Sequence, residues 1–136
     1  MDRKVQMVCL LLVFTQAGHS IEEYIGHLWE VLPPARYLCS LVSDDLEKGF
    51  LVINIGFFVL GILGWLLLVR TGHVLAKYII WFWIIIELIN GVGHVVWALI
   101  EASYRPGLIT APFLFGIAWC LRGLVQKSTD GGKVHS

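Results

Sequence analysis

The sequence predicts an all-α integral membrane protein, a four-helix bundle with both termini in the cytoplasm. Of its 136 residues, 57% are hydrophobic and only 15% are charged, against roughly 25% charged in ordinary soluble proteins. A soluble domain of this size cannot bury so much apolar surface, because its surface-to-volume ratio is too high. The apolar residues form continuous runs that do not alternate with polar ones, which favours helices over the strands of a membrane barrel.

The charge and cysteine contents exclude several classes of protein. Ten basic and ten acidic residues cancel, so no net field attracts nucleic acid. The three cysteines have no CxxC spacing, which argues against a disulfide framework and against a thiolate zinc site. The sequence carries no nucleotide-binding or haem-binding motif. We therefore expect membrane lipid to be the main partner.

Four segments are the candidate membrane spans. A helix needs about 20 mostly apolar residues to cross about 30 Å of hydrocarbon. We expect spans at approximately residues 5–32, 49–69, 73–101 and 107–125, which form one transmembrane domain over residues 1–125. Pro33-Pro34 would end the first helix. The remaining residues, 126–136, are polar and contain glycine, and we expect a disordered cytoplasmic tail.

The N-terminal segment has a second interpretation. Arg3 and Lys4 precede an apolar core, and Thr15-Gln16-Ala17 resembles a cleavage site, so residues 1–17 also fit a cleaved signal peptide. We favour one long helix, because the helical pattern continues beyond Ala17 as far as Leu32.

Lysine and arginine residues predict the orientation in the membrane. Seven of them belong to the side that holds both termini, and three belong to the other side. Both termini are therefore expected in the cytoplasm. Because no lipidation or endoplasmic-reticulum retention motif is present, we expect the plasma membrane if the source is prokaryotic.

Ionisable side chains inside the expected spans need an explanation, because each costs at least about 2.5–3.5 kcal/mol on insertion scales. On each of two helices they share one face, within an arc of about 140° on the first helix and about 60° on the third. With helix midpoints near Gly18 and Leu88, His19 is level with Glu87. These polar residues are His19, Glu22, Glu23, His27 and Glu30 on the first helix, and Glu87, Asn90, His94 and Glu101 on the third. Two polar faces at matched depth predict one shared site.

The composition of this site predicts a metal centre. The central parts of the spans contain no lysine or arginine, so protonation, protonated histidine or a bound cation must neutralise the carboxylates. Histidine nitrogen with carboxylate oxygen suits zinc, iron or manganese better than magnesium or calcium. We expect one divalent metal ion, with a remaining carboxylate as acid or base. The candidate ligands are His19, Glu22, Glu23, Glu87, Asn90 and His94, and the candidate catalytic residues are Glu22, Glu23 and Glu87.

Two further polar residues lie near the expected site. Asn54, on the second span, is expected to make a hydrogen bond between helices. Tyr104, after the third span, is expected either to anchor the outer surface or to extend its hydroxyl group to the site.

The motifs resemble those of a known family. His19-Ser20-Ile21-Glu22-Glu23 matches the His-x-x-Glu-Glu signature of the HXXEE family of small membrane proteins. Asn90 with His94, Tyr104-Arg105-Pro106-Gly107 and Thr110-Ala111 are also similar to that family's pattern, and the resemblance covers roughly residues 19–121. It implies a multi-span helical membrane protein whose histidine and glutamate residues matter, and it implies no substrate.

Three functions fit these observations. The first is a membrane enzyme that acts on a lipid-soluble substrate by metal-dependent or by acid/base chemistry. The second is the binding or transport of protons or metal ions, which would require a homo-oligomer because four short helices rarely form a transporter alone. The third is a structural membrane subunit whose polar face serves assembly. We favour the first.

Overall fold

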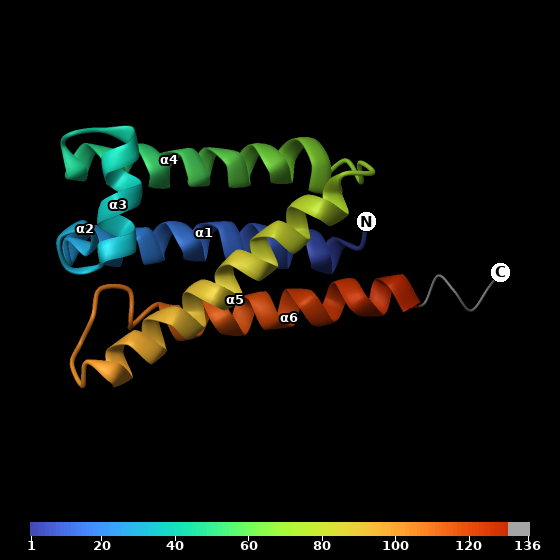
Figure 1. Ribbon diagram of the computed structural model, residues 1–136. Coiled ribbons are helices and arrows are strands. Elements are labelled where there is room, and N and C mark those ends of the chain that lie inside the picture. The colour runs from blue at the N-terminus through green and yellow to red at the C-terminus, as the bar shows by residue number, and fades with distance from the viewer. Residues whose placement is uncertain (131–136) are drawn as a thin grey trace.

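The computed structural model describes residues 1–130, and within them it contains helices and no strands (Figure 1). The prediction of an all-helical protein is confirmed. The helices are α1 (Arg3–Ile25), α2 (Leu28–Val31), α3 (Pro33–Val42), α4 (Leu46–Gly64) with its π-helical continuation η1 (Trp65–Val69), α5 (Ala76–Ile100) and α6 (Ala111–Asp130).

Three helical segments of the described chain are long and apolar enough to cross a membrane. They are α1, the continuous segment Leu46–Val69 that joins α4 to η1, and α5, in agreement with the first three expected spans. Helix α6 is not among them, because its second half carries Arg122, Gln126 and Lys127. The fourth span, and with it the four-span bundle, stays a prediction.

The long helices alternate in direction, so that α1 begins and α6 ends at the same end of the molecule (Figure 1). Helix α5 packs along α6, and α1 packs against both α4 and α6. Helix α5 runs obliquely across the others, contacts η1 near its own start and then diverges from α4 (Figure 1). The short helix α3 packs across the beginning of α4. As a result, α4 and α5 approach each other at one end only.

An apolar core joins α1, α5 and α6 in the half of the molecule that contains the N-terminus. Its buried members include Val5, Cys9, Leu12, Ile80, Trp83, Ile84, Leu114, Ala118 and Leu121. Gly61 brings α4 close to this core, because a Cβ atom there would lie 2.8 Å from Val13 Cγ1 and 3.1 Å from Trp83 Cζ2. All three cysteine thiols are free, as the absence of a CxxC spacing predicted.

The first helix is shorter than the sequence predicted. Helix α1 ends at Ile25 and not at Leu32. Gly26 follows it, and His27 then has a φ of 50°, in the left-handed region. A Cβ atom on Gly26 would lie 2.5 Å from Pro106 Cγ. Glycine therefore allows the segment between α5 and α6 to pack against the end of α1, and the helical pattern beyond it belongs to α2.

The boundaries of the last helix also differ from the prediction. Residues 107–110, which were assigned to the fourth span, lie in the connection that precedes α6. Gly107 has a φ of 92°, which is incompatible with a right-handed helix. At the other end α6 continues to Asp130, so residues 126–130 of the expected disordered tail are helical. The rest of that tail, 131–136, lies outside the described residues.

The close approach at Gly61 can be tested with a matched pair of glycine variants. We expect Gly61→Ala to lower the free energy of unfolding by about 1–3 kcal/mol, because its methyl group overpacks the contact with Val13 and Trp83. Gly56→Ala, on the same helix, has no neighbour within 4 Å and should change the free energy by no more than about 1 kcal/mol, the difference in helix propensity. Thermal unfolding in detergent, followed by circular dichroism, measures both. Equal effects would contradict the packing described.

Candidate functional site

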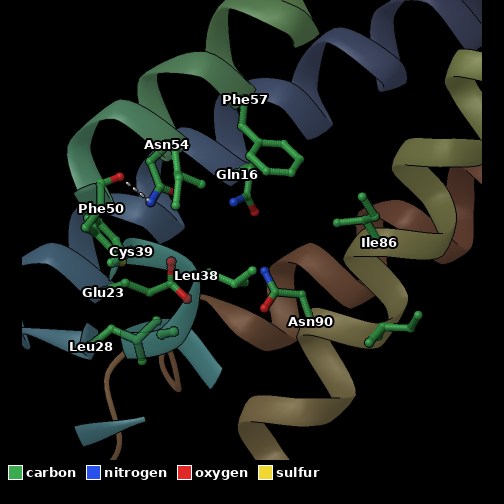
Figure 2. Close-up of a pocket in the computed structure, with 13 residues that line it drawn as sticks. Gln16, Glu23, Leu28, Leu38, Cys39, Phe50, Asn54, Phe57, Ile86 and Asn90 are labelled. Atoms are coloured by element: carbon green, nitrogen blue, oxygen red, sulfur yellow. Dashed lines mark hydrogen bonds between the residues drawn. The ribbon is translucent and has the colours of Figure 1, made fainter. Parts of the chain in front are cut away.

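A mostly apolar cavity of about 320 Å³ lies among α1, α3, α4 and α5 (Figure 2). Four of the side chains that line it are polar: Gln16 and Glu23 from α1, Asn54 from α4 and Asn90 from α5. Glu23 is also part of a buried polar cluster on the neighbouring side of α1, so the cavity adjoins that cluster.

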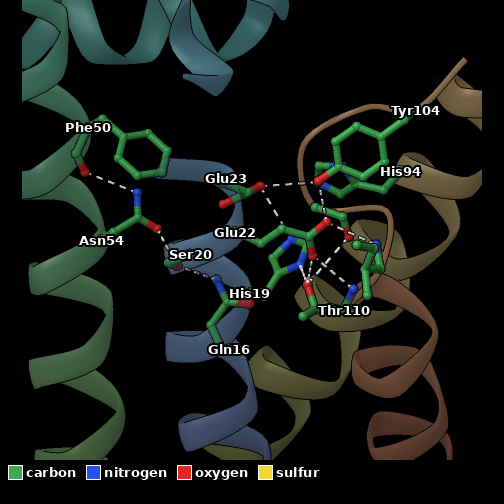
Figure 3. Close-up of polar contacts among 12 residues, drawn as sticks. Gln16, His19, Ser20, Glu22, Glu23, Phe50, Asn54, His94, Tyr104 and Thr110 are labelled. Carbon is green, nitrogen blue, oxygen red and sulfur yellow. Dashed lines mark hydrogen bonds and ion pairs between the residues drawn. The ribbon is translucent and has the colours of Figure 1, made fainter. Parts of the chain in front are cut away.

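This buried cluster consists of His19, Glu23 and His94 (Figure 3). Glu23 Oε1 lies 3.3 Å from His19 Nε2 and 3.1 Å from His94 Nε2. The two imidazole rings meet edge to face, with centroids 4.8 Å apart. The exposed fractions of the three residues are 0%, 6% and 5%. Each residue offers one ligand atom, and these atoms all lie within 4.8 Å of one another.

The register between α1 and α5 differs from the prediction by about two helical turns. His19 was expected level with Glu87, but the structure places it beside His94, seven residues further along α5. About half of this difference follows from the early end of α1, because the midpoint of Arg3–Ile25 is Phe14, whereas the prediction used Gly18. The midpoint of α5 is Leu88. Counted from the observed midpoints of the two helices, His19 is level with Gly93, the residue before His94. Glu23, one turn after His19, lies on the same face of α1.

Glu22, the other glutamate of the motif, has a different set of partners (Figure 3). Its Oε1 accepts hydrogen bonds from the Tyr104 hydroxyl at 2.7 Å and from the Ile109 N–H at 3.0 Å. Its Oε2 accepts from the Thr110 N–H at 2.9 Å and from the Thr110 hydroxyl at 2.6 Å. Glu22 therefore ties the segment between α5 and α6 to α1, and we do not include it among the proposed ligands.

Tyr104 reaches this end of the site through its hydroxyl group, which is one of the two alternatives that the sequence left open. Burial and the adjacent Glu22 carboxylate raise the pKa of Tyr104 to about 12. The phenol is therefore a neutral hydrogen-bond donor at physiological pH. Sequence reasoning did not identify the donor role of Thr110 or of the Ile109 N–H. The sequence signal that could have pointed to them is that the Glu22 carboxylate needs hydrogen-bond donors, since the central parts of the spans contain no lysine or arginine.

The Thr110 hydroxyl determines which nitrogen of His19 carries a proton. Its Oγ1 lies 2.6 Å from Glu22 Oε2 and 2.6 Å from His19 Nδ1. An ionised carboxylate can only accept, so the single hydroxyl proton points to Glu22, and His19 Nδ1–H must donate to Oγ1. In neutral His19, Nε2 then carries a lone pair that faces Glu23 Oε1. Two lone-pair atoms at 3.3 Å repel each other unless a proton or a metal ion lies between them.

Gly107 closes the cluster from the side of the α5–α6 segment. A Cβ atom at this position would lie 2.7 Å from Cε1 of both His19 and His94 and 2.8 Å from His94 Nδ1. Buried His19 Nε2 and His94 Nδ1 have no hydrogen-bond partner. The segment thus packs directly on both rings. Of these two nitrogen atoms, His19 Nε2 faces Glu23 and is available to a cation, whereas His94 Nδ1 faces Gly107 and the other nitrogen of that ring faces Glu23.

Two of the distances within the cluster agree with those between the ligands of one metal ion. Two ligand atoms bound to a tetrahedral zinc ion at about 2.0–2.1 Å lie about 3.3–3.4 Å apart. The two separations from Glu23 Oε1, 3.3 and 3.1 Å, are close to this value. His19 also has the arrangement usual for a metal-binding histidine, whose second nitrogen donates to a fixed acceptor.

Glu87 and Asn90 were predicted as ligands. Among the described residues, the group close enough together to hold a metal ion contains neither of them. Asn90 lines the cavity. Glu87, with an exposed fraction of 0%, faces the end of the Gln16 side chain, one terminal atom of which lies 2.8 Å from Glu87 Oε2 and 3.2 Å from Oε1. The carboxyl group of Glu87 is therefore close to the cluster along α5 without belonging to it.

A chain of hydrogen bonds from α4 indicates the protonation state of Glu87. Asn54 Nδ2 donates to the Phe50 carbonyl oxygen at 3.0 Å, so Asn54 Oδ1 accepts from the Ser20 hydroxyl at 2.7 Å. Ser20 Oγ is then an acceptor for Gln16 Nε2 at 3.3 Å. This leaves Gln16 Oε1 facing Glu87, where only a protonated carboxyl group can donate to it. With Glu87 ionised, the Gln16 amide must turn over, and two carbonyl oxygens then compete for the single Ser20 proton.

The chain of bonds also decides the role of Asn54. Because Asn54 and Ser20 belong to α4 and α1, the predicted hydrogen bond between helices is confirmed.

Fold and site together define a class: a helical protein with three segments able to cross a membrane and a buried histidine–glutamate cluster between two of them. Residues 10–121 match the family described as proteins of unknown function with an HXXEE motif. The match covers most of the chain, so the chain belongs to this family, as the resemblance implied. No curated protein and no solved structure matches it. The structure divides the motif, since His19 and Glu23 face His94 whereas Glu22 faces the α5–α6 segment.

The packing of Gly107 gives a first prediction for the site. We expect Gly107→Ala to lower the free energy of unfolding by about 2–5 kcal/mol, because it combines strain at positive φ with overlap of both imidazole rings. Gly93→Ala, next to His94, meets nothing within 4 Å and serves as the control. Thermal unfolding measures the effect, and the imidazole ¹⁵N resonances show whether the rings move. Unchanged resonances in Gly107→Ala would contradict the contact.

The hydrogen-bond chain gives a second prediction. We expect Glu87 to carry a proton at neutral pH, visible in the infrared spectrum as a carbonyl band of an un-ionised carboxylic acid that Glu87→Gln removes. The variant should remain as stable as the wild type, because the glutamine amide also donates to Gln16 Oε1. Glu30→Gln, at an exposed position, should leave the band intact. A wild-type spectrum without this band would show that these hydrogen bonds run in the opposite direction, with the Gln16 amide donating to an ionised Glu87.

Proposed function

We propose that the chain is an integral membrane enzyme in which His19, Glu23 and His94 bind one divalent metal ion and act on a lipid-soluble substrate. The observation that carries the proposal is the buried group of three ligand atoms with separations suited to a single metal ion. Zinc, iron and manganese are the metals that this combination of nitrogen and oxygen ligands favours.

The membrane part of the proposal rests on the three apolar helices. Helix α6 would be a fourth span, assisted by the apolar residues Leu108 and Ile109 that precede it. The cations Arg3, Lys4, Arg70, Arg122 and Lys127 belong to the end where α1 begins and α6 ends. By the positive-inside rule this end, and both termini with it, would face the cytoplasm.

The ligand set supports catalysis more than a purely structural metal. Two histidines with one carboxylate are found in catalytic zinc and non-haem iron sites, which retain positions for water or substrate. The metal ion would activate water or polarise a substrate oxygen. Thr110 and Glu22 would hold His19 in the required tautomer, and Glu87 would supply a proton as general acid.

Two alternatives use the same residues. A proton could take the place of the metal ion between His19 and Glu23, which would support acid/base chemistry or, in a homo-oligomer, proton transport. A structural subunit would need the bonds of Glu22 and Asn54 to join helices. It would not need the buried His19 Nε2 to face a carboxylate oxygen without a hydrogen-bond partner, which favours a site that binds a cation.

Metal analysis tests the proposal directly. We expect protein purified without a histidine tag in mild detergent to contain about one zinc, iron or manganese ion per chain by mass spectrometry. His19→Ala and His94→Ala should lose it, because each removes one of three ligands. Saturating metal should also stabilise the wild type, by about 2.7 kcal/mol at one hundred times the dissociation constant. With lipid extract as substrate, the metal-loaded wild type should consume a component that the His94→Ala variant leaves unchanged.

His27→Ala is the matched control, because His27 is an exposed histidine outside the cluster that pairs with Glu30 at 3.6 Å and stacks on Trp29. It should keep its metal and its stability. Helicity by circular dichroism must be the same in all variants for the comparison to hold. Wild-type protein that neither contains nor is stabilised by any of the three metals would overturn the metal site and leave the acid/base alternative.

A further inference from the structure

We propose that the cavity among α1, α3, α4 and α5 binds a single-chain lipid whose polar group is an uncharged oxygen group, a hydroxyl or a carbonyl. This inference rests on the proposed function, because it names the substrate class of the metal site. It is carried by three properties of the cavity, namely where it opens, what charge surrounds it and which side chains it shares with the cluster.

The position of the cavity suits a molecule that arrives from within the bilayer. It lies where α5 diverges from α4, beyond the contacts of α5 with η1 and of Trp83 with Phe57. Leu38 of α3 and Ile89 of α5 line it and are 53% and 67% exposed. Since both side chains are at the surface that would face lipid, an apolar chain can extend from the cavity into the bilayer between them.

Helix α3 closes the cavity at one end. A Cβ atom on Gly49 of α4 would lie 2.3 Å from the Cys39 carbonyl oxygen of α3, so the two backbones are in direct contact. Cys39 and Phe50 are buried together at this junction. Apolar side chains of α3 and α4 therefore form this end of the cavity. Its volume of about 320 Å³ is near the lower limit of small-molecule sites, which favours one chain over two.

The charges around the cavity favour an uncharged polar group. No lysine, arginine or histidine lines it, so a carboxylate or phosphate group would find no counter-ion. The acidic side chain in the lining, Glu23, is also unsuited to an anionic group. A charged group without a counter-ion at this depth would be costly.

The polar side chains of the cavity lie where such a group would end. Figure 2 shows Gln16, Glu23 and Asn90 directed towards the same space. The two amides can accept from a hydroxyl or donate to a carbonyl oxygen, and the carboxylate can accept from a hydroxyl. Because Glu23 also belongs to the cluster with His19 and His94, an oxygen group bound here lies beside the proposed metal ion. The same residue thus connects the lipid cavity to the reactive centre.

Photolabelling in a bilayer tests this inference. The protein is reconstituted into phosphatidylcholine vesicles with a long-chain alcohol or, separately, a fatty acid, each carrying the same photoreactive group near its end. We expect the alcohol to label residues that line the cavity, and the fatty acid of equal length to label them less by roughly tenfold. Ile86→Trp fills the cavity and should reduce labelling by the alcohol roughly tenfold or more.

Ile85→Trp is the matched control, since Ile85 is the neighbouring residue on α5, is exposed and does not line the cavity. It should label as the wild type does. Equal labelling by alcohol and fatty acid, or equal effects of the two tryptophan variants, would overturn the inference. Metal content is measured on the same samples. Retained metal with non-specific labelling refutes the lipid cavity alone, whereas specific labelling without metal refutes the metal site alone.

Discussion

The attachment of the α5–α6 segment to Glu22 is the constraint on which the rest of the site depends. Four hydrogen bonds to one carboxylate place Thr110 beside His19, and Thr110 in turn places the proton of that ring on Nδ1. The same segment brings Gly107 against both imidazole rings. Bonds to a charged acceptor are worth about 1.5–3 kcal/mol each, so the segment is held firmly although it has no regular structure. The cluster exists because a loop, and not only helix packing, fixes its geometry.

Two adjacent glutamates can occupy the same turn because they point to different partners. Successive residues on a helix differ by 100° in direction, so Glu22 faces the α5–α6 segment while Glu23 faces His94. Two carboxylates in one apolar environment would otherwise raise each other's energy. The donors at Glu22 are a phenol, a hydroxyl and two backbone N–H groups, whereas the groups that face Glu23 are the histidines His19 and His94. The motif therefore joins one carboxylate suited to structure with one suited to chemistry.

The sequence predicted the parts of this arrangement that depend on local pattern. The apolar runs predicted α1, α4–η1 and α5, and the polar faces predicted that α1 and α5 share a site containing His19, Glu23 and His94. It could not predict the end of α1, because Gly26, which follows that end, packs against Pro106, eighty residues away in the chain. The error in that boundary displaced the predicted register and paired His19 with Glu87. The roles of Thr110 and Gly107 depend on contacts across the chain, which no periodicity records.

The two sides of α1 differ in a way that bears on how a ligand reaches the site. On the side of α6, the four hydrogen bonds of Glu22 and the close packing of Gly26 and Gly107 hold the α5–α6 segment against α1. On the side of α4, the polar contacts with α1 near the site are two hydroxyl bonds, from Ser20 to Asn54 and from Tyr24 to Glu47. The cavity lies on this second side and shares Glu23 with the cluster. A ligand would therefore approach between α4 and α5, and the cluster would meet it with the one carboxylate that the α5–α6 segment leaves available.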